Sequence, residues 1–168
     1  MSEYQDKYWR EMDQLKTHTI YLELYLEDTI SKDRYLNMFL AIASSGSIAT
    51  WAFWQEHTMV WAGIIAASQV AQAIKPFLPY TKRLKAMTAA TNDLEALFIS
   101  METHWFDVYE YKLSDEDIHK LHMSFKEKKR QILQKHLGSE SVSAPHEEKY
   151  KTKAQSISKS YFTSMYPA

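Results

Sequence analysis

The chain reads YLNMFLAIASSGSIATWAFWQ over residues 35–55 and HTMVWAGIIAASQVAQAI over residues 57–74, two runs without a charged side chain. Glu56 is the one charge between them. At a rise of about 1.5 Å per residue, helices of 21 and 18 residues could each cross a hydrocarbon core that is roughly 30 Å thick. The second helix would be only just long enough. The pattern predicts a transmembrane helical hairpin over residues 35–75, with a very short turn at residues 54–57.

The residues that flank the two runs are distributed as they are at membrane interfaces. Aromatic side chains gather at both ends: Trp51, Phe53, Trp54 and Trp61 near the turn, and Tyr35, Phe77 and Tyr80 at the opposite end. Basic side chains flank only the end away from the turn: Lys32, Arg34, Lys75, Lys82, Arg83 and Lys85. Trp and Tyr favour interfacial layers, and Lys and Arg favour the cytoplasmic side. Both termini are therefore predicted to lie in the cytoplasm.

Polar and small side chains interrupt both runs. The polar residues predicted to line a path or to join helices are Asn37, Ser44, Ser47, Thr50, Ser68, Gln69 and Gln72. Small residues recur at every fourth position: Ala41, Ser45 and Ala49 in the first run, and Gly63, Ala67 and Ala71 in the second. Small-residue faces let membrane helices approach closely, and polar side chains in lipid need partners or water. The hairpin is therefore predicted to self-associate. Its polar faces either line a water-filled path or form hydrogen bonds between helices.

The polar content of the two runs also permits an interpretation without a membrane. In a soluble protein, two central helices buried in a bundle or an oligomer would be apolar as well, and their polar groups would find partners in neighbouring helices. The aromatic and basic residues around the runs nevertheless favour a bilayer as partner, and the small and polar residues within them favour a homo-oligomer.

Heptad spacing on both sides of the runs predicts two long amphipathic helices. Residues 3–31 carry a stripe at alternating spacings of four and three: Tyr8, Met12, Leu15, Thr19, Leu22, Leu26 and Thr29. Residues 80–112 carry a second stripe: Leu84, Met87, Thr91, Leu94, Phe98, Met101, Trp105, Val108 and Lys112. Such stripes form the seam between packed helices. We expect these two helices to pack on each other within one chain, outside the membrane.

A further helix is predicted from Ser114 to about Leu137. Ser114 followed by three acidic residues has the pattern of an N-cap and a first turn, and Gly138 suits the position after the last turn. A basic face on this helix is either solvated or in contact with a lipid headgroup or a nucleotide phosphate: Lys126, Lys128, Lys129 and Arg130.

The chain divides into four regions on these patterns. They are an amphipathic helix (1–34), the transmembrane hairpin (35–75), a cytoplasmic helical region (76–137), and a linker with a basic tail (138–168). With only three Gly and four Pro among 168 residues, long uninterrupted helices are expected. The predicted fold class is all-α, with a two-helix transmembrane hairpin between long amphipathic cytoplasmic helices, and the protein is expected to be oligomeric.

Composition favours a protein that is not an enzyme. The chain has no Cys and no glycine-rich phosphate loop, so it lacks a thiol nucleophile and the common nucleotide-binding motifs. His119 and His122 have a spacing that can share a metal, but no third ligand is marked, and neither a metal nor a cofactor is predicted. The net charge of −1 gives no general attraction to nucleic acid.

This arrangement resembles the SLATT family of bacterial two-transmembrane effectors. The resemblance covers about residues 5–137. It lies in the N-terminal amphipathic helix, two close spans (36–54 and 58–74) and the long helix with KRLKAMTAATNDLEALFISMETHWFDVYEY. It implies a protein of the bacterial inner membrane that accompanies a nucleotide-second-messenger system of phage defence. It further implies that a nucleotide signal or a regulatory partner triggers association, permeabilisation of the membrane and arrest of the infected cell.

Three hypotheses follow for the function. The first is a pore-forming or membrane-disrupting effector, the toxic arm of a phage-defence system. The second is a membrane-anchored adaptor whose cytoplasmic helices bind a partner protein. The third is a soluble helical-bundle oligomer without pore activity.

Overall fold

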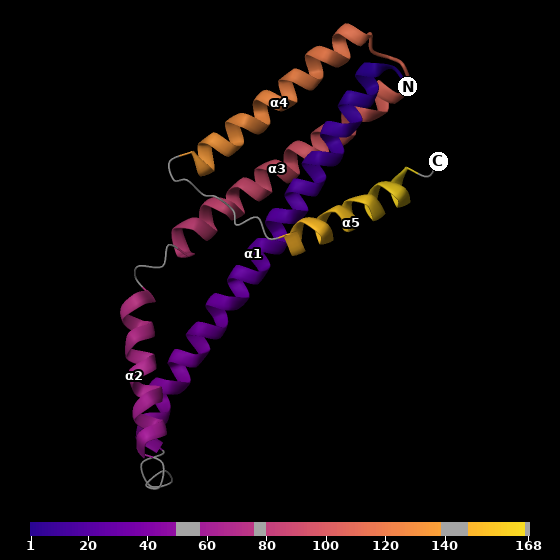
Figure 1. Ribbon diagram of the computed structural model, residues 1–168. Coiled ribbons are helices and arrows are strands. Elements are labelled where there is room, and N and C mark those ends of the chain that lie inside the picture. Colours follow the sequence, from indigo (N-terminus) through magenta and orange to yellow (C-terminus); the bar gives the residue numbers. More distant parts are fainter. Residues whose placement is uncertain (50–57, 76–79, 139–147, 167–168) are drawn as a thin grey trace. The chain divides into compact units, whose positions relative to one another are not determined.

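The computed structural model describes residues 1–49, 58–75, 80–138 and 148–166, and over these residues the protein is all-α, without a strand. This confirms the predicted fold class at the level of secondary structure. The described residues form five helices, in chain order (Figure 1): α1 (Glu3–Ala49), α2 (Thr58–Ile74), α3 (Tyr80–Tyr109), α4 (Asp115–Leu137) and α5 (Glu148–Met165).

The chain folds into two compact units. The first, here called the bundle, combines Met1–Leu26 with Arg83–Ala168, and the second, the hairpin unit, comprises Glu27–Lys82. Helix α1 contributes its first part to the bundle and its second part to the hairpin unit. The large cluster of buried apolar side chains lies entirely on segments of the bundle, between Tyr8 and Leu26 and between Met87 and Phe162.

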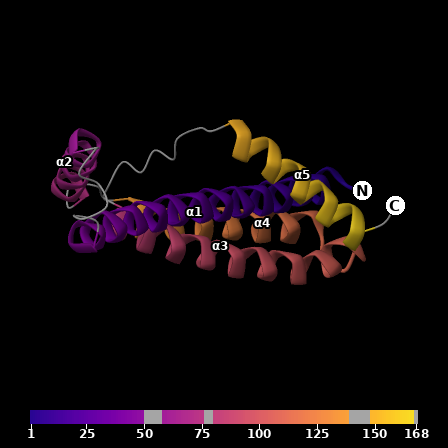
Figure 2. The same ribbon diagram turned by 90° about the horizontal axis from the view of Figure 1, so that it is seen from below.

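In the bundle, α1 and α3 run antiparallel, and α4 and α5 pack on opposite sides of this pair (Figures 1 and 2). On one side, the ring of Phe125 from α4 meets Tyr8 of α1 edge to face, with centroids 6.1 Å apart. On the other side, Phe162 from α5 lies 4.9 Å from Trp9 of α1 and 6.2 Å from Phe98 of α3. All four helices therefore contribute to one core.

The two predicted heptad stripes form the centre of this core. On α1 the seven members of the first stripe, from Tyr8 to Thr29, are all buried, and on α3 the members from Met87 to Val108 are buried as well. Two threonines fit because their hydroxyl groups donate to the carbonyl four residues earlier, Thr19 to Leu15 at 3.0 Å and Thr91 to Met87 at 2.9 Å. The predicted packing of the two amphipathic helices within one chain is confirmed over the bundle.

The structure lengthens the first predicted helix. The expected helix over residues 3–31 is the beginning of a longer helix, because residues 31–34, expected as a junction, are helical. They contain neither Gly nor Pro, and side-chain pairs one turn apart support the backbone there: Lys32 with Asp28 at 2.6 Å, and Asn37 with Asp33 at 2.9 Å. Helix α3 conversely ends at Tyr109, so that Lys112, the last residue of the second stripe, is exposed beyond it.

The helix ends show one confirmed prediction and one correction. Ser114 is the N-cap of α4, with its hydroxyl group accepting from the backbone N–H of Asp117 at 3.2 Å. Gly138 ends α4 with a φ of −75°, so it does not supply the left-handed conformation expected after the last turn. Space explains the glycine instead, because a Cβ there would lie 2.4 Å from the carbonyl oxygen of Gln134.

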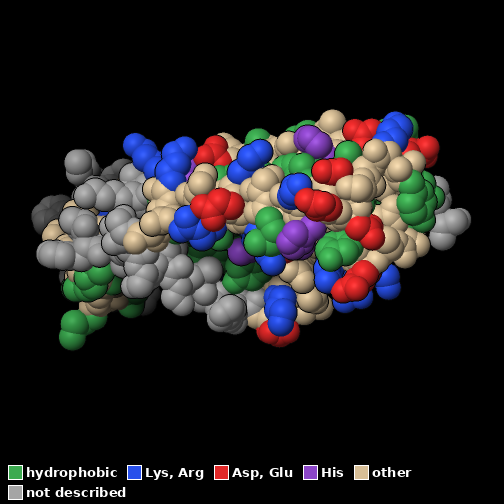
Figure 3. Space-filling view, turned by 90° about the horizontal axis from the view of Figure 1, so that it is seen from above, with side chains coloured by type: hydrophobic (Ala, Val, Ile, Leu, Met, Phe, Trp, Pro, Cys, Tyr) green, Lys and Arg blue, Asp and Glu red, His purple; other side chains and the backbone are tan. Residues whose placement is uncertain are grey.

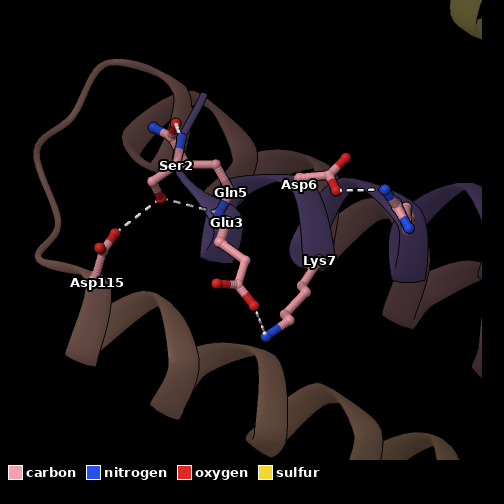
Figure 4. A network of polar contacts seen from close by, with 7 residues as sticks. Ser2, Glu3, Gln5, Asp6, Lys7 and Asp115 are labelled. Carbon is pink, nitrogen blue, oxygen red and sulfur yellow. Dashed lines mark hydrogen bonds and ion pairs between the residues drawn. The ribbon is translucent and has the colours of Figure 1, made fainter.

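The start of α1 has a capping box that the sequence reading missed. The backbone N–H of Ser2 donates to Gln5 at 2.7 Å, and the N–H of Gln5 donates back to the Ser2 hydroxyl at 3.3 Å. The same hydroxyl group donates to Asp115 at 2.8 Å, which ties the start of α1 to the start of α4 (Figure 4). Gln5 also donates to the carbonyl of Val108 at 2.7 Å, beneath the surface.

None of the described helices combines the length and the apolar character needed to span a bilayer. The described parts of the hairpin predicted over residues 35–75 are helical, and no transmembrane hairpin is found among them. Its predicted turn at residues 54–57, and the prolines at 76 and 79, lie outside the residues that the structure describes.

Candidate functional site

The hairpin unit has a narrow internal interface. Among its described side chains past residue 35, only Leu40 and Ala43 of α1 and Ser68 of α2 are buried. The Ser68 hydroxyl group donates to the carbonyl of Ile65 at 2.8 Å, so its hydrogen bond is made within α2. The contact between α1 and α2 in this unit is therefore made by a few small and aliphatic side chains. Most of the described surface of the two segments is exposed.

Two segments of this unit, residues 35–49 and 58–74, have an uncharged and largely apolar outer surface. From Tyr35 to Ala49 and from Thr58 to Ile74 the helices carry no Asp, Glu, Lys or Arg. The exposed fractions are 70% for Tyr35, 66% for Ile42 and 89% for Met59. Other large apolar side chains are exposed on the same two segments: Met38, Phe39, Val60, Ile65, Val70 and Ile74. Apolar surface gathered in this way marks a site of interaction with protein or membrane.

A polar cluster in the hairpin unit joins α1 to the residue that follows α2. Asn37, which the sequence placed on a polar face of the first span, donates through Nδ2 to Asp33 at 2.9 Å. Its Oδ1 atom accepts a hydrogen bond from Lys75, which directly follows α2. Asn37 therefore joins the two helices at their charged end, where the amide is satisfied by both neighbours.

Three of the other predicted polar residues lie on α2 and differ in their exposure. Gln69 and Gln72 are exposed, whereas Ser68 faces the seam. Ser44, Ser47 and Thr50 lie where the structure describes no side chains. The structure thus brings Asn37 and Ser68 into contacts within the chain and directs the two glutamines outward.

The predicted small-residue faces are not the seam of this unit. Ala41, Gly63 and Ala67 are exposed, Ala71 is half-buried, and the side chains of Ser45 and Ala49 are outside the described set. A Cβ added at Gly63 would meet no atom within 4 Å, so the backbone is open to an approaching surface there. A packing role between copies of the chain stays a prediction for these residues.

The predicted basic face of α4 is partly engaged by acidic side chains. Lys129 donates to Glu11 of α1 at 2.9 Å, and both side chains are mostly buried. Arg130 donates to Glu127 at 2.7 Å and 2.9 Å, and Lys128 lies 5.2 Å from the centroid of Phe125. On the face seen in Figure 3, acidic and basic side chains alternate over the bundle. Contact with a headgroup or phosphate stays a prediction.

Glu11 is the centre of an ionisable cluster between α1 and α4. Its burial acts to raise the pKa of its carboxyl group, but the hydrogen bond and charge of Lys129, with Lys126 and His122, bring that pKa below its ordinary value. The Nε2 atom of His122 lies 3.8 Å from Glu11 and is buried without a hydrogen-bond partner. Burial lowers the pKa of His122 and also that of His18, beside the same Lys129.

The two histidines with metal-ligand spacing belong to different surroundings. His119 meets the ring of Tyr4 edge to face at 5.7 Å, while His122 faces Glu11. Among the described residues, no group of three or more His, Asp or Glu side chains is arranged to hold a metal ion. Both histidines thus face side chains of α1.

Sequence reasoning missed the partners of the conspicuous residues. Glu11 precedes Met12 of the first stripe, a flanking position at which packed helices place charge pairs, and this signal was present in the sequence. Its partner Lys129 is 118 residues away and could not be identified from spacing. Comparison of the chain with protein-family models, curated proteins and solved structures yields no match.

Proposed function

We propose that the protein is a self-associating membrane effector, whose hairpin at residues 35–74 inserts into a bilayer and permeabilises it. The observation that carries this proposal is the uncharged outer surface of residues 35–49 and 58–74, on which large apolar side chains such as Ile42, Met59 and Val70 are exposed. A surface of this kind is stable in contact with lipid chains or with other apolar helices. The bundle, with its own core, would remain beside the membrane.

The distribution of polar groups supports insertion from one side. Lys75 and the Asn37–Asp33 pair lie together at one end of the hairpin, where long basic side chains reach the headgroup layer. The exposed amides of Gln69 and Gln72 are costly against lipid and are satisfied by water or by a second hairpin. Self-association therefore accounts for polar groups that a lone hairpin would leave unpaired.

The resemblance to the SLATT family extends the proposal to a biological setting. In that setting the protein acts at the bacterial inner membrane, with both termini cytoplasmic, as the toxic arm of a phage-defence system. A nucleotide signal or a regulatory partner protein triggers it.

The first test is extraction of the membrane fraction with alkaline carbonate after expression. The wild-type chain is expected to stay in the membrane pellet. Ile42→Asp with Val70→Asp, which puts charges on both exposed apolar segments, is expected to release the protein. Ile157→Asp, at an exposed apolar position of α5 in the bundle, is the matched control and should leave the distribution unchanged. Recovery of the wild type without membranes, as a defined oligomer, would replace the proposal with a helical oligomer.

The second test separates permeabilisation from anchoring. Liposomes loaded with a fluorescent dye are expected to leak when the purified wild-type chain is added. Gln69→Leu with Gln72→Leu should stay in the membrane and reduce leakage at least several-fold, because the polar face is lost. Membrane retention with no leakage by the wild type would leave an anchored adaptor as the function. Full leakage by the double variant would remove these two glutamines from the path.

A further inference from the structure

A cavity of about 560 Å³ lies in the bundle among the first turns of α1, the last turns of α3 and the end of α5. Five aromatic side chains line it: Trp9, Trp105, Phe106, Tyr109 and Tyr166. Phe106 and Tyr109 are also exposed, so solvent reaches the cavity past them. Its volume is that of a site for a small molecule.

The aromatic rings that line the cavity are set at angles to one another and pack against each other. The rings of Trp9 and Trp105 are 4.9 Å apart at 49°, and Tyr166 stands 5.3 Å from Trp9 at 87°. Tyr109 lies 6.0 Å from Trp105 at 44°. Phe162, which is buried, packs against Trp9 from behind at 4.9 Å and holds its ring in place. Trp105 is buried among its neighbours, so the aromatic surface open to a bound group belongs to the exposed Phe106 and Tyr109 and the half-buried Trp9 and Tyr166.

Met1, which carries the amino terminus, and two carboxylates, Glu102 and Glu110, complete the lining, and no Lys, Arg or His side chain is part of it. Glu102 accepts hydrogen bonds from the hydroxyl groups of Tyr161 at 2.6 Å and Tyr166 at 3.0 Å. Burial and the neighbouring Glu102 raise the pKa of Tyr166 to about 12, so this phenol remains a donor to the carboxylate at neutral pH. Among the described residues, neither Glu102 nor Glu110 forms an ion pair with a basic side chain.

We propose that this cavity binds a small organic cation of the quaternary or alkylammonium class. Aromatic ring faces attract such cations through their quadrupoles, and the two carboxylates outnumber the single amino terminus of Met1 in the lining, which leaves an excess of negative charge at the same place. The chain itself shows the contact at the rim, because the ammonium group of Lys112 lies 4.1 Å from the centroid of Phe106. This site is independent of whether the hairpin enters a bilayer.

The second large cavity of the bundle has a different chemistry. It measures about 610 Å³ and lies where α1 meets α4 and α5. Two lysines and two carboxylates line it with a single aromatic ring, Tyr21: Lys129, Lys151, Asp13 and Glu148. The two lysines and the two carboxylates of this lining balance in charge, so the lining indicates no class of ligand. The first cavity differs from it in having mainly aromatic side chains and an excess of carboxylates.

The test uses choline as the probe and its neutral isostere, 3,3-dimethyl-1-butanol, as the control. The full chain is labelled with 5-fluorotryptophan in a maltoside detergent, which has no ammonium headgroup, and titrated by ¹⁹F NMR. Trp9 and Trp105 resonances are expected to shift with choline, while the three tryptophans of residues 51–61 stay in place. Choline is expected to bind at least about tenfold more tightly than the isostere.

Two exposed positions allow variants that should keep the fold. Glu110→Gln and Tyr109→Leu are each expected to weaken choline binding by about fivefold or more, whereas Glu116→Gln, an exposed carboxylate on α4, should leave it unchanged. Equal affinity for choline and the isostere would show an apolar cavity and overturn the proposal. No shift of the Trp9 and Trp105 resonances at about 50 mM choline would also overturn it, whatever the outcome of the membrane tests.

Discussion

Single residues in the bundle show how a narrow core accepts polar groups. The buried hydroxyl groups of Thr19 and Thr91 bond to their own helices, and the phenol of Tyr8 reaches the carbonyl of Met101 at 2.9 Å. Glu11 keeps its charge between α1 and α4 because Lys129 is in contact with it. His122 is the exception, since its Nε2 atom is buried without a hydrogen bond. Buried polar groups of this kind make folding sensitive to protonation.

The free energy of unfolding is expected to fall as the pH drops below about 6.5. Burial lowers the pKa of His18 and His122 from their ordinary value of 6.5, so in the window below it the unfolded chain binds more protons than the folded chain. Linkage then makes stability decrease with decreasing pH. The lowered pKa of Glu11 adds a further loss at more acidic pH, below its ordinary value of 4.5.

Urea unfolding followed by circular dichroism at pH 7.5 and 5.5 checks this expectation. The double variant His18→Gln, His122→Gln should lose less stability between the two pH values than the wild type does. His119→Gln, at an exposed position on α4, is the control and should behave like the wild type. An identical pH dependence in the double variant would show that other groups govern it.

At the scale of elements, helix ends and helix faces are specified by different signals. The start of α4 depends on contacts three residues apart, Ser114 to Asp117, and that of α1 on Ser2 and Gln5. The packed faces depend on heptad spacing, and every residue of the α1 stripe from Tyr8 to Thr29 is buried. The continuation of α1 beyond residue 31 follows from the lack of a helix-breaking residue there.

Removing the N-cap of α4 is expected to cost about 1 kcal/mol of stability. In Ser114→Ala, the backbone N–H of Asp117 loses its 3.2 Å partner at the first turn of the helix. Ser164→Ala serves as the control, because that exposed hydroxyl group donates to a carbonyl within α5 and caps nothing. Urea midpoints at pH 7 compare the two. Equal losses in both variants would argue against a capping role for Ser114.

At the scale of the whole molecule, the bundle has a large apolar core of its own, whereas the part of the hairpin unit that the structure describes does not contribute to that core. The large buried cluster takes its members from α1 up to Leu26 and from α3, α4 and α5, and none from the described side chains of residues 27–82. The hairpin unit has the narrow seam at Leu40, Ala43 and Ser68 and an apolar outer surface. The burial of a large apolar cluster therefore stabilises the bundle, whereas the described contact between the helices of the hairpin unit is narrow.

Replacing residues 27–82 by a short Gly/Ser linker is expected to leave the bundle folded. Leu26 and Leu84 lie on antiparallel neighbouring helices of the same unit, so a flexible linker can join them. The shortened chain should be highly helical by circular dichroism, unfold in one cooperative transition and need no detergent. A chain that lacks a cooperative transition would show that the hairpin is part of the folding unit.

The sequence by itself determined the features of this protein that depend on near neighbours. The helical class, both buried stripes and the Ser114 cap follow from spacings of three and four residues, because such spacings place side chains on one face or one turn. The tertiary structure alone decided which faces meet. It paired Glu11 with Lys129, placed α5 against Trp9 and Phe98, enclosed the aromatic cavity, and turned Ala41 and Gly63 outward. These contacts join residues far apart in the chain, and periodicity carries no information about which distant segment comes to lie beside another.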